Sequence, residues 1–111
     1  MKKHFPVMDK KILKELKKKL SSALNGKIIS LVLFGSRARG DFDSESDIDI
    51  AIIVKDLSRE IRNKILAIVI ELEFKYCVPL SIIIFSDQDF KRLKRKERRI
   101  ALDIEKEGIP L

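Results

Sequence analysis

The stretch LVLFGSRARGDFDSESDIDIAIIV, Leu31–Val54, places an apolar strand, a glycine-bounded basic turn and a strand with two carboxylates in direct succession. Leu31–Phe34 closes the first strand, and Gly35 follows where a short helix would begin. Glycine has no Cβ, and the first N–H groups of a helix lack partners within it, so an anion can approach the backbone closely here. The turn is therefore predicted to bind an anion.

The residues after Gly35 favour phosphate as that anion. Ser36 adds a hydroxyl donor, Arg37 and Arg39 supply fixed positive charge, and Gly40 lets the chain leave the turn with unusual dihedral angles. We therefore predict that Gly35, Ser36, Arg37 and Arg39 bind the phosphates of a nucleoside triphosphate.

Two aspartates open the second strand of the stretch. In SDIDIAIIV the alternation after Ser46 places Asp47 and Asp49 on one face, with Ile48 and Ile50 on the other. Two carboxylates this close repel each other unless a hard divalent cation holds both in the ionised form. We predict that Asp47 and Asp49 are Mg²⁺ ligands, and that the metal bridges them to the phosphates.

The combined motif resembles the signature of the DNA polymerase β-like nucleotidyltransferase superfamily, in which GS is followed by DxD at the start of a strand. Gly35-Ser36 and Asp47-x-Asp49 occur in that order, and GSRARG followed by SDIDI looks most like the minimal nucleotidyltransferases of bacteria and archaea. The alternative interpretation gives the motif no function. In it, an arginine-rich turn forms surface ion pairs with the acidic start of the strand.

The resemblance implies a fold, an activity and a partner. The fold would be α+β in two layers, a small mixed sheet of about three strands with flanking helices, in one domain spanning residues 1–111. The activity would be Mg²⁺-dependent transfer of a nucleoside monophosphate, AMP from ATP, with Asp47 and Asp49 as the catalytic metal ligands. Minimal members often pair with a separate helical HEPN-domain protein as its antitoxin, and the acceptor would be a tyrosine of that toxin.

One part of the family site is missing from the sequence. For Gly35 to meet Asp49, the first two strands should run antiparallel, and a crossover helix should make the third strand parallel to the second. The family's third carboxylate then belongs near Ser81, which cannot ionise at neutral pH. The alternative to an enzyme is therefore a degenerate binding module that neutralises its partner by contact.

The rest of the chain reads as alternating helices and strands. Apolar residues recur at helical spacing after Asp9, which is expected to cap the first helix, and again over Ser58–Tyr76. Strands are predicted for Lys27–Phe34 and Leu80–Phe85. One continuous helix is predicted from the cap at Ser86 to Gly108. Glu71 and Glu73 are expected to face solvent.

Composition limits the function classes. The 111 residues are 45% hydrophobic and 37% charged, with a net charge of +7, and contain no apolar run long enough for a membrane span and no secretory signal. A cytoplasmic protein is expected. Cys77, expected in the core, is the only cysteine, which excludes an intramolecular disulfide and a cysteine-based zinc site.

A dense basic cluster lies in the C-terminal part, and its members are Lys91, Arg92, Lys94, Arg95, Lys96, Arg98 and Arg99. It is either a solvated helix face or a docking surface for RNA or an acidic protein. We do not expect direct nucleic-acid binding, because the cluster lacks aromatic stacking groups.

An antibiotic nucleotidyltransferase would need a further helical domain. A chain this short would reach its acceptor through a partner or a homo-oligomer.

Overall fold

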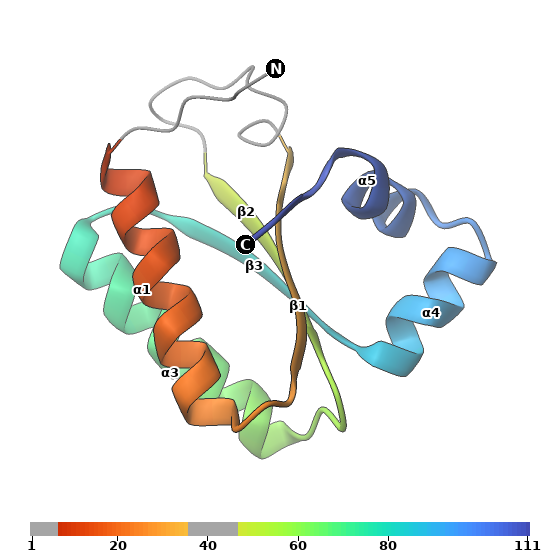
Figure 1. Cartoon of the computed structure of the whole chain (residues 1–111), viewed down its shortest axis with the longest axis horizontal. Coiled ribbons are helices and arrows are strands. Elements are labelled where there is room, and N and C mark those ends of the chain that lie inside the picture. The colour runs from red at the N-terminus through yellow and green to blue at the C-terminus, as the bar shows by residue number, and fades with distance from the viewer. Residues whose placement is uncertain (1–6, 36–46) are drawn as a thin grey trace.

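The computed structural model describes residues 7–35 and 47–111 of the chain. The predicted α+β class, a mixed sheet with flanking helices, is confirmed (Figure 1). In chain order the elements are α1 (Val7–Leu24), β1 (Ile28–Phe34), β2 (Ile48–Val54), α3 (Arg59–Tyr76), β3 (Leu80–Ser86), α4 (Asp87–Arg95), α5 (Arg99–Glu107) and β4 (Ile109–Pro110). Among the described residues, none of the helices has the length and apolar character needed to cross a membrane.

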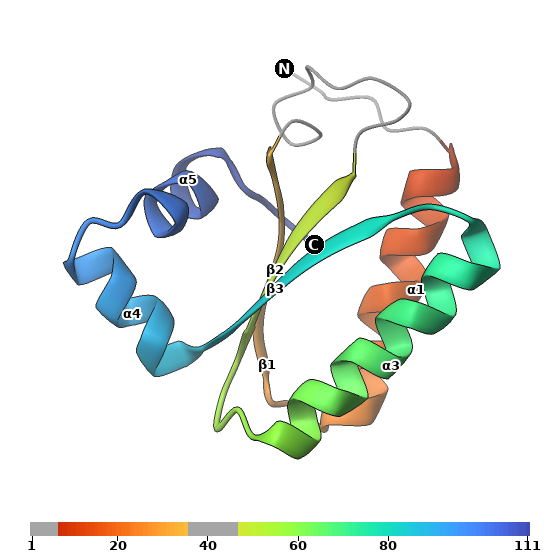
Figure 2. The same cartoon turned by 180° about the vertical axis from the view of Figure 1, so that it is seen from behind.

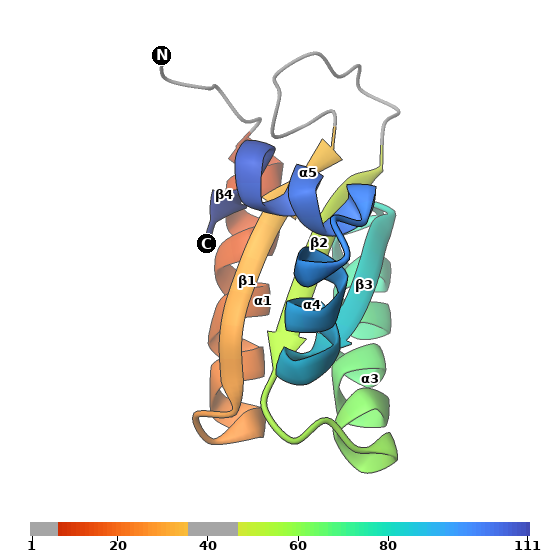
Figure 3. The same cartoon turned by 90° about the vertical axis from the view of Figure 1, so that its right-hand side faces the viewer.

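The sheet has the strand order β3-β2-β1-β4, and Figure 3 shows the strands side by side. β1 pairs antiparallel with β2, and β2 pairs parallel with β3, as the crossover argument predicted. The sequence had indicated about three strands; the fourth is the short β4, which pairs antiparallel with β1. A strand of two residues is too short to show a periodicity in the sequence. It is a strand only because it pairs with β1.

Helices cover both faces of the sheet. Figures 1 and 2 show α1 and α3 on one face and α4 and α5 on the other. The larger core, between the sheet and α1 and α3, buries Leu16, Leu33 and Ile50 completely. On the other face a smaller core contains Phe34, Ala51, Ile53, Phe90, Ala101 and Ile104. The fold therefore has a second helix layer beyond the two layers expected.

Local signals define the ends of α3. The Ser58 side chain accepts a hydrogen bond from the Ile61 N–H at 3.2 Å, which satisfies one of the free donors at the helix start. Cys77 ends the helix in the left-handed conformation, with φ of 52°. Its side chain is exposed, so its expected place in the core was wrong. The cap predicted for the first helix was wrong, because α1 begins at Val7, before Asp9.

The predicted single C-terminal helix is two helices. Glu97 adopts φ of 53°, and the Arg98 N–H donates to the Leu93 carbonyl at 2.9 Å, so the chain turns sharply between α4 and α5. This turn lets Ala101 and Ile104 of α5 pack in the same core as Phe90 of α4. No glycine or proline marks the break, which is why helical periodicity alone did not indicate it.

An ionic cluster joins α1 to α3. Glu15 Oε1 accepts hydrogen bonds from the Tyr76 hydroxyl at 2.6 Å and from Lys75 Nζ at 2.9 Å, and Lys19 pairs with Glu71. The Tyr76 hydrogen bond, followed by that from Lys75, lowers the pKa of Glu15 from 4.5 to about 2. The same contact raises the pKa of Tyr76. Glu15 therefore stays ionised at any moderately acidic pH.

Candidate functional site

The site predicted from the sequence lies where β1 ends beside the start of β2. Phe34 is the last residue of β1, and its register partner on β2 is Asp49. Gly35 follows Phe34, so the backbone of the turn enters directly against the Asp49 side chain. The antiparallel pairing thus brings together the two halves of the motif, as the sequence predicted.

The contact at Gly35 leaves no room for a side chain. A Cβ built on Gly35 would lie 3.1 Å from Asp49 Cγ and 3.2 Å from Asp49 Cβ, and still closer to the carboxylate oxygen Oδ2. Gly35 also has φ of +74°, a conformation that residues with a Cβ rarely adopt. The sequence singled out this glycine for anion access; the structure adds that it must accommodate the Asp49 carboxylate.

The two aspartates occupy different positions relative to β2. Asp49 lies within the strand and is half-buried, while Ile48 and Ile50 point into the core beneath α1 and α3. Alternation along the strand therefore turns Asp49 to the opposite face, which agrees with the predicted separation of acids and isoleucines. Asp47 precedes the strand and is exposed. A metal held by both would lie at the mouth of the sheet rather than inside the core.

Three of the predicted phosphate-binding residues, Ser36, Arg37 and Arg39, lie outside the described residues. Their roles stay predictions. Of the predicted phosphate-binding turn, the structure describes Gly35 alone.

The sequence predicts that the missing third carboxylate belongs near Ser81. Asp49 on β2 and Ser81 on β3 are partners in the parallel register, and both are half-buried. Their side chains leave the sheet on the same face, because paired residues of neighbouring strands share a face. β3 reads LSIIIFS and contains no acid that could replace Ser81.

Glu73 is nearer to this end of the sheet than the sequence indicated. Its carboxylate oxygen Oε2 accepts the N–H of Leu80 at 2.9 Å, and the side chain is half-buried, so the expectation that it faces solvent was wrong. Glu71 does lie in solvent and pairs with Lys19. No sequence signal identified Glu73, because its hydrogen bond depends on how the chain returns from α3 into β3.

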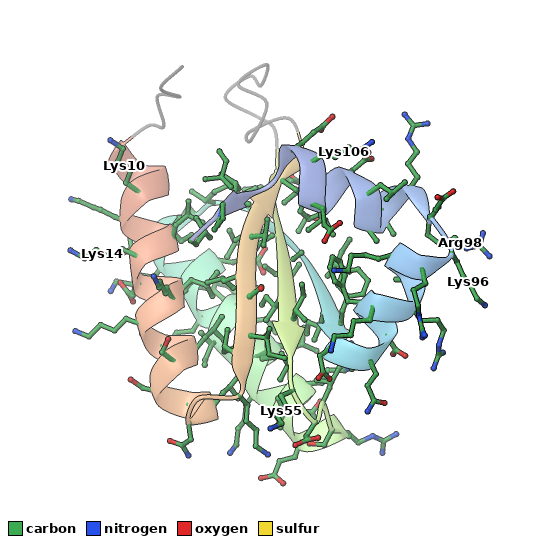
Figure 4. The ribbon with its side chains drawn as sticks, turned by 45° about the vertical axis from the view of Figure 1, so that its right-hand side comes forward. Lys10, Lys14, Lys55, Lys96, Arg98 and Lys106 are labelled. Atoms are coloured by element: carbon green, nitrogen blue, oxygen red, sulfur yellow. The ribbon has the colours of Figure 1, made fainter. Side chains whose placement is uncertain are left out.

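Positive charge is spread around the molecule. Figure 4 shows Lys10 and Lys14 projecting from α1 on one side and Lys96 and Arg98 projecting on the other. Within the basic cluster, Arg92, Lys94 and Arg99 each pair with an acid, and four residues form no ion pair among the described residues: Lys91, Arg95, Lys96 and Arg98. The nearest aromatic side chain, Phe90, is buried against Phe85 rather than open to a base.

Comparison with known sequences identifies relatives along most of the chain. The profile of the nucleotidyltransferase domain family matches residues 9–107. A candidate protein adenylyltransferase of Methanocaldococcus jannaschii, MJ0141, is 43% identical over 75 residues, which cover 67% of this chain and 76% of the relative. A second candidate protein adenylyltransferase from the same organism, MJ0604, is 37% identical over 84 residues, which cover 76% of this chain and 80% of the relative.

Solved structures share the fold. A candidate nucleotidyltransferase from Sulfolobus solfataricus superposes with a TM-score of 0.54 at 21% identity, over 90% of this chain and 76% of its own. A toxin–antitoxin complex with AMP-PNP gives a TM-score of 0.52 at 20% identity, over 87% of this chain and 70% of the other. A mutant of the toxin–antitoxin complex MntA-HpeT gives a TM-score of 0.53 at 18% identity, over 89% of this chain and 70% of the other. At these identities the likeness concerns the fold alone.

Proposed function

This chain belongs to the nucleotidyltransferase domain family, and from that membership we propose that it transfers AMP from ATP to a hydroxyl group on a protein. The observation that carries the proposal is the contact between Gly35 and Asp49, which brings the glycine at the end of β1 against a carboxylate near the start of β2. The names of the two archaeal relatives, both candidate protein adenylyltransferases, support AMP as the transferred group and a protein as the acceptor.

The described carboxylates suit magnesium. Mg²⁺ binds through one or two carboxylates and keeps the rest of its shell for water and substrate phosphates. Asp47 and Asp49 supply such a pair, and the described residues contain no group of three or more possible ligands that would form a closed protein site. When bound, the metal would offset negative charge that develops on the phosphates.

The chain's own residues have the following roles in this proposal. Asp47 and Asp49 would hold the metal. Gly35 gives the triphosphate access to the backbone, Ser36 donates a hydrogen bond to it, and Arg37 and Arg39 offset the charge of the departing pyrophosphate. Deprotonation of the acceptor hydroxyl must come from a group other than Ser81, which is a poor base at neutral pH.

A protein partner completes the proposal. The resemblance to minimal nucleotidyltransferases suggests a helical HEPN-domain toxin whose tyrosine receives AMP, and two toxin–antitoxin complexes share the fold. A groove between α1 and α3 is a suitable docking surface, because its rim is basic and its floor is apolar: Lys11, Lys14 and Lys18 line it with Ala23 and Ile68. An acidic amphipathic helix would match both features.

The second candidate is a binding module that retains the fold without turnover. Ser81 favours it, since the register partner of Asp49 lacks the carboxylate that the family uses. Such a protein would still neutralise its partner by contact, and its affinity for ATP would not matter to that role.

Transfer of label from α-³²P-ATP to a co-purified partner distinguishes the two candidates. The proposed enzyme labels the partner only when Mg²⁺ is present, and Asp49→Asn removes the labelling while leaving the complex intact. A wild-type protein that binds the partner but labels neither it nor itself would leave the binding module as the function.

A further inference from the structure

Within residues 7–35 and 47–111, the outer side of β3 is an unpaired sheet edge. β3 and β4 end the sheet, and Figure 3 shows β3 at its margin. β4 has two residues and contains Pro110, which blunts that edge, whereas β3 has seven residues, LSIIIFS, without charge or proline. No strand among the described residues pairs with the outer side of β3. Natural proteins rarely leave so long and apolar an edge without a partner.

The hydrogen-bonding pattern shows which backbone groups are available. The Ile48 N–H donates to the Pro79 carbonyl. The parallel ladder between β2 and β3 therefore uses the odd residues Pro79, Ser81, Ile83 and Phe85. The even residues direct their N–H and C=O groups outward. The first of these, Leu80, donates to Glu73, and the next two, Ile82 and Ile84, offer four polar groups to an incoming strand.

An apolar stripe on α3 runs beside this edge. Leu66, Ile70 and Phe74 are 41%, 52% and 82% exposed, and their spacing of four places them on one face of the helix. Glu73, three residues after Ile70, reaches the outward N–H of Leu80, so this face borders the free edge of β3. The other flank of α3 meets α1 through Glu71.

We propose that a second copy of this chain covers the surface, with β3 pairing antiparallel to β3 and α3 packing against α3. Such an interface has a two-fold axis, so each surface must complement itself. With the axis at Ile83, Ile82 of one copy lies opposite Ile84 of the other. With the axis at Ile70, Leu66 lies opposite Phe74. These facing pairs, Ile82 with Ile84 and Leu66 with Phe74, are then free of charge.

The two residues on the proposed axis, Ile83 of β3 and Ile70 of α3, lie at the same level along their elements. α3 and β3 run in opposite directions and are joined by a short turn after Tyr76. Ile83 is about 10 Å beyond Leu80 along β3, and the same distance back along α3 is about seven residues, which reaches the level of Ile70. One axis can therefore pass through both.

Charge on the opposite face of the sheet agrees with this arrangement. α4 packs on β3, with Asp87 and Asp89 in its first turn and Arg92, Lys94 and Arg95 in its last. The two-fold axis sets the α4 helices of the two copies antiparallel. The acidic turn of one then lies toward the basic turn of the other, which favours a second copy over an unrelated strand.

Sedimentation velocity on the full chain tests the proposal. We expect the wild type to have about twice the 12.8 kDa chain mass. Ile70→Lys places two like charges on the axis and should return the mass to that of one chain. Ile29→Lys is the matched control, because Ile29 is 50% exposed but lies on β1, and this variant should stay dimeric. Circular dichroism shows that each variant is folded.

A charge-pair test addresses the facing residues directly. Leu66→Lys and Phe74→Glu should each weaken the dimer, and the two substitutions together should restore it, because each introduced cation then lies opposite an introduced anion of the other copy. A wild type that stays monomeric at high micromolar concentration overturns the proposal. So does a folded Ile70→Lys variant that remains dimeric, or a double variant no tighter than the single ones.

Discussion

Asp49 on β2 and Ser81 on β3 are direct partners in the parallel register of the sheet. This places a hydroxyl where the family resemblance predicts a third carboxylate, beside the aspartate that we propose as a metal ligand. In the proposed function, this pair is the feature that separates the enzyme from the binding module.

Ser81→Asp should therefore increase AMP transfer, because it puts a carboxylate beside Asp49 by a single change. A carboxylate that acts as a general base contributes about 10²–10⁴-fold, so a gain of about 10²-fold is expected in labelled-ATP incorporation. Ser21→Asp, on the exposed side of α1, is the control and should have no effect. Equal activity of Ser81→Asp and the wild type would mean that a different group supplies the base.

Asp47→Asn combined with Asp49→Asn should abolish the gain in ATP affinity that Mg²⁺ provides. The reason is that neutral amides are weak magnesium ligands compared with carboxylates. Calorimetric titration with ATP, with and without Mg²⁺, measures the gain. Asp56→Asn removes an acid beyond the other end of β2 and should behave as the wild type. A double variant with an unchanged Mg²⁺ effect would contradict the proposed metal site.

Gly35→Ala should lower ATP affinity by tenfold or more, because its Cβ would displace the Asp49 carboxylate. Gly26→Ala is a matched control: Gly26 also has a positive φ, 81°, but a Cβ there meets nothing within 4 Å. Both variants should lose about 1–2 kcal/mol of stability through the left-handed backbone. If the two variants bind ATP equally well, the contact between Gly35 and Asp49 has no part in nucleotide binding.

Stability should fall between pH 4.5 and about 2 through Glu15. The pKa of Glu15 is lowered to about 2 in the folded protein from its ordinary 4.5, chiefly by the Tyr76 hydroxyl. A depressed carboxyl pKa stabilises the fold fully above pH 4.5, and that contribution disappears as pH falls through the folded value. Thermal unfolding against pH measures this loss.

Tyr76→Phe is the informative variant for that experiment. It removes the largest cause of the shift but keeps the ring, so the pKa of Glu15 should rise and the acid-dependent loss should become smaller. Glu15→Gln should remove the contribution of Glu15 to the loss. An NMR titration of the Glu15 carboxyl that gives an ordinary pKa in the wild type would show that the cluster does not persist in solution.

The elements with strong periodicity were predictable from the sequence. The apolar spacing after Asp9 and from Ser58 to Tyr76 indicated α1 and α3, and the predicted capping role of Ser86 is confirmed. The relative directions of β1, β2 and β3 also followed, from the requirement that Gly35 and Asp49 meet and from the handedness of the crossover. These signals lie within single segments or in the order of segments along the chain.

The break between α4 and α5, the short strand β4 and the hydrogen bond of Glu73 were not predictable in this way. Each depends on a contact with a segment elsewhere in the fold. Residues of α5 pack in the same core as Phe90, β4 pairs with β1, and the Glu73 carboxylate accepts the Leu80 N–H. The local sequence at these places permits other conformations, and packing selects among them.

The sequence by itself determined the chemistry of the candidate site: a glycine turn, two aspartates at strand spacing, and a serine in place of an acid. Only the tertiary structure decided that Gly35 has no space for a Cβ beside Asp49, that Ser81 is in register with Asp49, and that no other described strand pairs with the outer side of β3. The physical reason is that side-chain identity is local, whereas strand register and edge exposure come from the pairing of segments far apart in the chain.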